Sequence, residues 1–434
     1  MKRLAIGGGL AMGFMAVAAC ATSEEPTRPL PEPEPKVVDA SVQDVVVGSD
    51  DANGEPSGPP CNADGWCKTV LPDADLVLKD IWPLPEQAFA IADSYNSGVK
   101  VLEWTSADST WRYIDDNSQN EKAFAEFGAR IWAPSADEVY YAVSPGTVFH
   151  GTRPVPPATA WSWSSSRLQD NNVRPIEGDY RARTIGVWGT GSQDVYAWHS
   201  NTVFRAERPG NGGIEWVVEY VANDFDTADE QLAISGIAGT AGDDLWFAGA
   251  RSGDFGIGGG CSILVRKAGE GYRRIADGVR SPNCTAREGV PLLLGNVTWP
   301  TELQSWGPNR VFFGALDTLL AVQIMEDGGA YSVREAVVPS AVWEPLGTPF
   351  GDISKITSFW RESEDHLWFV GGYAKSARGL VARGTRIWDD GGNFQFSSTA
   401  HNGVPSRVAN RIRGTSATNL WIVGDRYALH KTTP

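Results

Sequence analysis

The sequence predicts an all-β protein, a seven-bladed β-propeller whose last blade is completed by a strand from the N-terminal side. An aromatic strand motif recurs seven times at spacings of 50 to 66 residues. The 434-residue chain contains 48 glycines and 18 tryptophans, which suit tight turns and short strands, and we find no long stretch with a helical period. The last copy of the motif also lacks a strand that the beginning of the repeat region could supply.

Residues 1–19 have the pattern of a secretion signal. Met1 is followed by the basic residues Lys2 and Arg3. Residues 4–19 are all apolar or glycine, a stretch that is short for a membrane span. The segment Val17-Ala18-Ala19-Cys20 resembles the lipobox of bacterial lipoproteins. That resemblance implies cleavage before Cys20, attachment of acyl chains such as palmitate to its thiol, and, since Ala21 follows, an outer-membrane location in the cell envelope. The alternative is an ordinary secretion signal with an incidental cysteine.

Residues 20–60 form a predicted tether that begins at the lipidated cysteine. Residues 21–60 hold eight prolines and nine acidic side chains against only two basic ones. Such a segment cannot bury enough apolar surface to fold, so we expect it to be disordered and extended. This tether would hold the predicted propeller domain, residues 61–434, away from the lipid surface.

The repeat region is built from one motif. A small or glycine-rich turn is followed by a polar pair and then by an apolar strand that carries an aromatic residue. Each copy can be read as four strands, with the aromatic on the second and another aromatic on the fourth, which suits propeller blades better than a helical solenoid. The seven aligned aromatics are Phe89, Tyr140, Tyr196, Trp246, Phe312, Trp368 and Trp421.

The seventh copy predicts how the ring closes. After Trp421 the chain provides one more strand, residues 427–431, and then reaches Pro434. Residues 64–70 look like a fourth strand with no first three strands before them. We therefore expect the strand around Trp66 to complete the last blade, which would remove two open sheet edges. The alternative is an open or stacked β-array.

The repeats resemble those of surface lipoproteins from myxobacteria and, more loosely, the propellers of bacterial two-component sensors. The resemblance covers residues 61–434 and rests on the motif described above. It implies a propeller fold but hardly constrains the function, because propellers carry many unrelated activities.

The cysteines predict two disulfides. If Cys20 is lipidated, an even number remains in an exported chain, and four cysteines allow three pairings. We favour the two sequence-local bonds, Cys61–Cys67 and Cys261–Cys284. Zinc is the alternative, but its sites usually pair cysteines two to four residues apart, which is closer than these separations.

The chain offers no convincing catalytic, metal or cofactor site. The acidic pairs Asp243-Asp244 and Glu364-Asp365 occupy a repeat position that other copies fill with Asn or Arg, which indicates a turn. No two of the five histidines stand at metal-ligand spacing, and nucleotide-binding and serine-hydrolase motifs are absent from the sequence. Trp161 and Trp163 could present a sugar-binding surface, but core packing on a fourth strand explains them better.

Charge and architecture together favour a binding role. With 37 basic and 53 acidic residues the net charge is −16, and without a basic cluster the chain is not expected to bind nucleic acid. We predict a monomeric, non-enzymatic binding or scaffolding module that contacts the membrane only through its lipid and binds an unknown envelope protein or glycan. The long fourth unit, residues 250–300, is expected to contribute. The alternatives are a carbohydrate-active hydrolase or lyase that uses carboxylates at the channel mouth, and an assembly factor of the envelope.

Overall fold

The protein is described from a computed structural model that covers residues 61–433 with internal gaps. The gaps are residues 121–126, 172–184, 211–212, 228–229, 253–259, 281–282, 296, 298, 316–317, 340–341, 343–352, 374–378, 390–391 and 402–406. The predicted signal peptide (1–19), lipidation site Cys20 and tether (20–60) lie outside the described residues.

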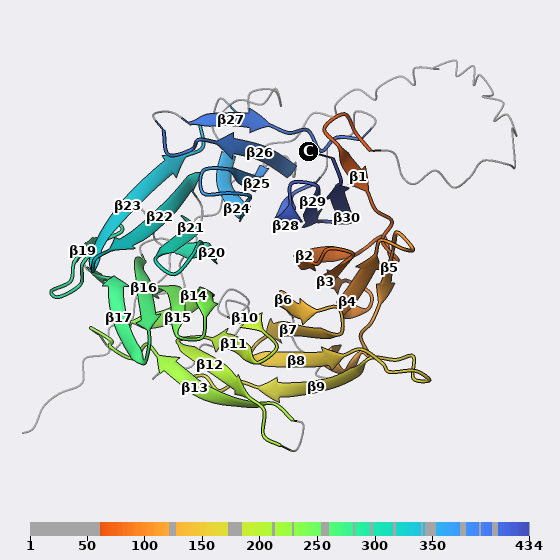
Figure 1. Ribbon diagram of the computed structural model, residues 1–434, viewed down its shortest axis with the longest axis horizontal. Coiled ribbons are helices and arrows are strands. Elements are labelled where there is room, and N and C mark those ends of the chain that lie inside the picture. The colour runs from red at the N-terminus through yellow and green to blue at the C-terminus, as the bar shows by residue number, and fades with distance from the viewer. Residues whose placement is uncertain are drawn as a thin grey trace, which may run out of the picture. The chain divides into compact units, whose positions relative to one another are not determined.

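The described chain forms seven four-stranded antiparallel sheets arranged as blades around a central axis (Figure 1). Each blade begins with the strand nearest the axis and ends at the rim, as the repeat motif predicts. Blade 1 comprises β2 (Val77–Pro83), β3 (Gln87–Ser94), β4 (Gly98–Thr105) and β5 (Thr110–Tyr113). Blade 2 comprises β6 (Phe127–Ser135), β7 (Glu138–Ser144), β8 (Thr147–Thr152) and β9 (Ser162–Arg167). Blade 3 comprises β10 (Ile185–Gly191), β11 (Asp194–His199), β12 (Thr202–Glu207) and β13 (Glu215–Val221).

The remaining blades repeat this order. Blade 4 comprises β14 (Gln231–Ala241), β15 (Asp244–Ser252), β16 (Cys261–Ala268) and β17 (Gly271–Ala276). Blade 5 comprises β20 (Pro300–Ser305), β21 (Arg310–Ala315), β22 (Leu320–Asp327) and β23 (Ala330–Val337). Blade 6 comprises β24 (Ile353–Arg361), β25 (Leu367–Tyr373), β26 (Gly379–Thr385) and β27 (Asn393–Phe396). Blade 7 comprises β28 (Ala409–Ser416), β29 (Asn419–Gly424), β30 (Tyr427–Lys431) and β1 (Trp66–Lys68).

Strand β1 closes the ring as predicted. It pairs antiparallel with β30, with Trp66 opposite Lys431 and Lys68 opposite Leu429. The Trp66 side chain is fully buried between blades 6 and 7, where it contacts Trp368 edge-on. Two segments from opposite ends of the described chain therefore share one sheet, in which β1 covers the edge that β30 would otherwise expose.

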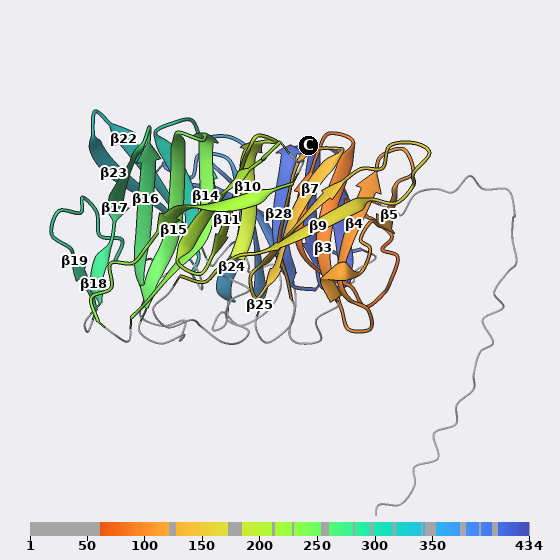
Figure 2. The ribbon, with the colours of Figure 1, turned by 90° about the horizontal axis from the view of Figure 1, so that it is seen from below.

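Packing between blades holds the ring together. The first strand of every blade contacts the first strands of both neighbours, so the seven inner strands form a closed cycle. A cluster of buried apolar side chains fills each interface between adjacent blades. All seven aligned aromatics, for example Trp246 and Trp421, are buried there. In side view the strands run between the two faces of the disc (Figure 2).

Few described residues depart from the blade pattern. They include one short 3₁₀ helix, η1 (Ser118–Asn120), and no helix long and apolar enough to cross a membrane. The long fourth unit adds a hairpin, β18 (Gly278–Arg280) and β19 (Cys284–Ala286), beside blade 4. Both sequence-local disulfides are present: Cys61–Cys67 fixes the start of β1, and Cys261–Cys284 joins this hairpin to β16.

The candidate site in the central channel

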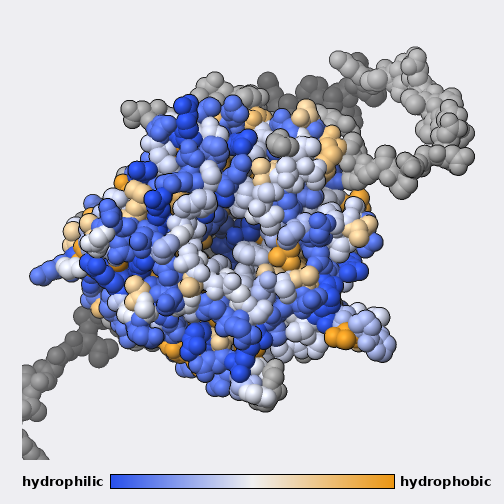
Figure 3. Space-filling model, in the orientation of Figure 1, coloured by the Kyte–Doolittle hydropathy of each residue, from blue (hydrophilic) through white to orange (hydrophobic). Residues whose placement is uncertain are grey.

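A cavity of about 310 Å³ occupies the central channel. All seven inner strands contribute residues to its wall, and Trp198 of β11 adds to them. On the face shown in Figure 3 the centre of the disc is hollowed and the residues deep in the hollow are hydrophilic. Its volume lies at the lower end of the range of small-molecule sites. The channel is therefore the place where the blades jointly form a binding-sized space.

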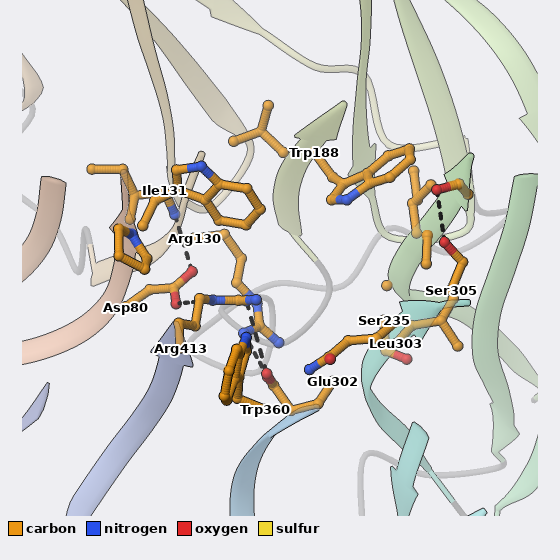
Figure 4. Close-up of a pocket in the computed structure, with 18 of the residues that line it drawn as sticks. Asp80, Arg130, Ile131, Trp188, Ser235, Glu302, Leu303, Ser305, Trp360 and Arg413 are labelled. Atoms are coloured by element: carbon orange, nitrogen blue, oxygen red, sulfur yellow. Dashed lines mark hydrogen bonds and ion pairs between the residues drawn. The ribbon is translucent and has the colours of Figure 1, made fainter. Parts of the chain in front are cut away.

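Five nearly buried charged side chains form one ion-paired group at this channel. Four of them line the cavity, and the fifth, Arg411, pairs with two of the four. They come from blades 1, 2, 5 and 7, and Figure 4 shows four of them converging on one side of the cavity. None of the five side chains is more than 18% exposed. The members of this cluster, which we call the channel cluster, are Asp80, Glu302, Arg130, Arg411 and Arg413.

The two carboxylates organise the channel cluster. Asp80 forms ion pairs with Arg411 at 3.1 Å and Arg413 at 3.2 Å, and it accepts hydrogen bonds from the backbone N–H groups of Ile81 and Ile131. Arg130 Nη1 donates to a Glu302 oxygen at 2.8 Å. Both carboxylates are therefore occupied as acceptors by arginine and backbone donors.

Glu302 receives further support from the inner strands of blades 6 and 7. Arg411 also contacts its carboxylate, and the Ser358 hydroxyl donates to it at 3.2 Å. The backbone N–H of Ile412 in turn donates to the Ser358 oxygen, which fixes that hydroxyl. The Glu302 side chain is 1% exposed, so it is withdrawn from solvent as well as ion-paired.

Irregularities in the inner strands put these side chains into the channel. The register of the sheet shifts beside Asp80 in β2, across Arg130 in β6, across Glu302 in β20 and beside Arg411 in β28. A bulge places an extra residue in one strand and redirects a side chain, and bulges are frequent beside functional sites. Glu302 in addition has a φ of +55°, a left-handed conformation that residues with a Cβ rarely adopt.

The guanidinium group of Arg130 is strongly desolvated. Burial is the main cause that lowers the pKa of Arg130 to about 10; Asp80 opposes this change, and the neighbouring Arg413 contributes to it. Arg130 nevertheless remains protonated at neutral pH. All three arginines of the channel cluster therefore carry positive charge in the channel, against two carboxylates.

Aromatic and aliphatic side chains form the rest of the wall. Trp82, Trp188 and Trp360 line the cavity with Leu303. The Arg413 guanidinium lies over the Trp82 ring, 5.4 Å from its centroid, so the apolar and charged parts of the wall are continuous. Trp198 is 4% exposed, and its indole N–H has no hydrogen-bond partner among the described residues.

The residues considered from the sequence lie elsewhere. Asp244 starts β15, where it accepts a hydrogen bond from Thr240 and pairs with Arg266, which is the turn role predicted for it. His150 and His430 stand in third strands, stacked on Tyr140 and Trp421 respectively. No histidine lines the channel cavity, and no cluster of His, Cys, Asp or Glu in the described part of the chain could hold a metal ion.

A second buried charge cluster supports the long fourth unit. Arg251 is completely buried and forms ion pairs with Glu230 at 2.6 Å and Asp277 at 3.0 Å. Asp277 also pairs with Arg274 and Arg287, which ties β17 and the segment after β19 to the blade. Residues 271–276 are the outer strand of blade 4 and not a separate insertion. The ion pairs of this second cluster therefore hold the long fourth unit together.

Comparison with solved structures shows the fold. The chain is similar to YCF48 from Cyanidioschyzon merolae (13% identity, 85% of this chain and 99% of that chain, TM-score 0.50) and to YCF48 bound to D1 peptide (11%, 87% and 98%, TM-score 0.51). The WD40 propeller domain of Doa1 also matches, with 9% identity, 84% and 96% coverage and a TM-score of 0.45. No protein-family model and no curated protein sequence matches the chain.

Proposed function

We propose that the chain is a lipid-anchored protein of the cell envelope, attached through Cys20, whose propeller is a non-enzymatic binding or scaffolding module. The central channel is its binding site. The observation that carries this proposal is the channel cluster: inner-strand irregularities in four blades collect buried charged groups around one cavity. A purely structural ring does not need charged side chains at its axis, and burying them costs free energy.

The chemistry of the channel favours binding over hydrolysis. A glycoside hydrolase needs one carboxyl group that can give up a proton and a second that can attack or activate water. Among the described residues, the carboxylates that line the cavity are Asp80 and Glu302, and both form ion pairs with arginines. The alternative of a carbohydrate-active enzyme therefore has little support. One of the similar propellers has a peptide bound, which fits a peptide or protein partner for this ring.

The channel assignment can be tested in intact cells with two matched variants. Thr415 is exposed and lines the cavity, so T415W should fill the channel entrance without disturbing the channel cluster. Thr110 is an exposed residue on β5 at the outer rim, and T110W adds the same bulk there. After crosslinking and purification, partners should be recovered with the wild type and T110W but lost with T415W. Equal recovery with T415W would contradict a channel site.

The anchor has a separate test. C20S should release the protein from the membrane fraction as a folded, soluble form, because the acyl chains supply the membrane affinity. Fractionation and a melting curve measure both properties. A C20S protein that stays with the membrane would rule out lipid attachment at this residue.

A further inference from the structure

We propose that the channel cavity binds an anion, specifically a carboxylate carried on an aromatic or apolar body. The inference deepens the proposed function and rests on it in one respect, that the cavity is the binding site. Charge, hydrogen-bonding capacity and the nature of the wall each point to this ligand.

The first argument is charge. The channel cluster contains three guanidinium groups and two carboxylates, all linked by ion pairs. One positive charge is therefore left over in a nearly buried site. An uncompensated buried charge is costly, and a bound monoanion would balance it. The chain as a whole is acidic, but salt screens its distant charges within about 10 Å, so the local excess decides what the cavity accepts.

The second argument is hydrogen-bonding capacity. Each guanidinium group carries five N–H donors and no acceptor. The acceptors of the channel cluster are already shared, since Asp80 also binds two backbone N–H groups and Glu302 also binds Ser358. The indole N–H of Trp198 adds a buried donor without a partner in the described part of the chain. The cavity thus has donors in excess, and a ligand with two acceptor oxygens would satisfy them.

The third argument is the wall. Trp82, Trp188, Trp360 and Leu303 all line the cavity that the charged groups line. Figure 4 shows Trp360 beside these groups and Trp188 farther across the cavity. A small hydrophilic anion would leave these surfaces in contact with water. A cation would meet the excess positive charge, and a neutral sugar would leave that charge unbalanced. A carboxylate attached to an apolar or aromatic group matches both sides of the cavity.

The test uses the purified full-length protein and two pairs of probes. The first pair is 3-phenylpropionate and its neutral amide, titrated by calorimetry. The second is the tripeptide glycylglycylphenylalanine with a free or an amidated C-terminus. We expect the free acid to bind at least about tenfold more tightly than the amide in one or both pairs, because charge-assisted hydrogen bonds are strong. Preference within the first pair alone indicates a free acid, and preference within the second indicates a peptide C-terminus.

Two variants link that preference to named groups. R130M brings the channel cluster to two positive and two negative charges and should abolish the preference for the acid. W198F removes the indole N–H together with part of the ring, so it should weaken binding of the acid several-fold more than binding of the amide. R112M is the matched control, since Arg112 is half-exposed and pairs with Glu103 away from the channel cluster, and it should bind like the wild type. A melting curve for each variant verifies folding.

The outcomes separate this inference from the proposed function. If the folded wild type binds no free acid, or binds acid and amide equally, the anion inference is wrong even when T415W still loses its partners. If a folded R130M protein keeps the preference for the acid, the excess guanidinium charge is not its cause and the inference also fails. If the free acid binds but T415W retains every partner, the anion site stands and the proposed use of the channel for partners falls.

Discussion

Removing the Trp66 side chain should show how much the closure of the ring contributes to stability. Trp66 is the fully buried residue of β1, a three-residue strand that joins the two ends of the repeat region. Its ring meets Trp368 at a centroid distance of 5.9 Å, and its indole N–H donates to Ser397 Oγ at 2.9 Å. W66A deletes both contacts and leaves a cavity between blades 6 and 7.

The expected cost is about 3 to 5 kcal/mol, the usual range for replacing a buried tryptophan with alanine. The loss of stability should lie near the upper end of this range if the neighbouring side chains cannot fill the cavity, because Trp66 packs against two blades at once. Urea unfolding followed by fluorescence measures it. Tyr95 is 97% exposed, so Y95A serves as the control and should change the free energy of unfolding by less than about 0.5 kcal/mol.

A second consequence distinguishes closure from ordinary core packing. Deleting residues 61–69 would uncover the edge of β30, which β1 normally covers. An exposed edge strand pairs with other chains, so the deleted protein should associate in a concentration-dependent way that light scattering detects. If W66A loses less than about 1 kcal/mol and the deleted protein stays monomeric, β1 is not the element that holds the ring shut.

Three other perturbations follow from the packing. Replacing Cys261 and Cys284 together with serine should cost about 3 kcal/mol, measured by urea unfolding with and without reductant, because the bond closes a loop of 23 residues in the unfolded chain. R251M should cost about 3 to 5 kcal/mol in urea unfolding at pH 7, since it leaves buried carboxylates without their ion-pair partner; a loss below about 1 kcal/mol would contradict this account. Burial lowers the pKa of His430 to about 4, below the usual 6.5, so the unfolded state takes up more protons between these values and stability falls as pH drops from about 6.5 to 4. Relative to H430Q, the wild type should lose about 2 to 3 kcal/mol more over that interval in urea unfolding, after allowance for partial solvent screening, and parallel pH profiles would refute the shift.

The blade architecture could be predicted because it repeats. Each copy of the motif carries its own turn, its buried aromatic and its strand lengths, so seven weak local signals support one another. The closing strand followed from the same logic: Trp66 matched the fourth-strand position of other copies, and the seventh copy lacked that strand. Disulfide pairing also followed from local spacing.

The channel cluster could not be predicted in the same way. Asp80 and Arg413 are 333 residues apart in the sequence and meet only because the ring closes. Each lies one residue from an isoleucine of the first-strand motif, Ile81 or Ile412, and there looks like an ordinary polar residue of an exposed strand. The usable signal was a charged residue beside the central isoleucine of a strand that must line the axis. Its partner could be named only after the blade order and the irregularities of the inner strands were known.

These irregularities explain how a repetitive fold can acquire a specific site. The apolar residues of the motif face the neighbouring blades, where any change disturbs a packed interface. The residue at the inner-strand irregularity faces the channel instead, so it can differ from blade to blade without altering that packing. It is Asp80 in blade 1, Arg130 in blade 2 and Glu302 in blade 5. Ligand specificity in this ring is therefore set by a few channel-facing positions, and substitutions there should change what binds while the propeller stays folded.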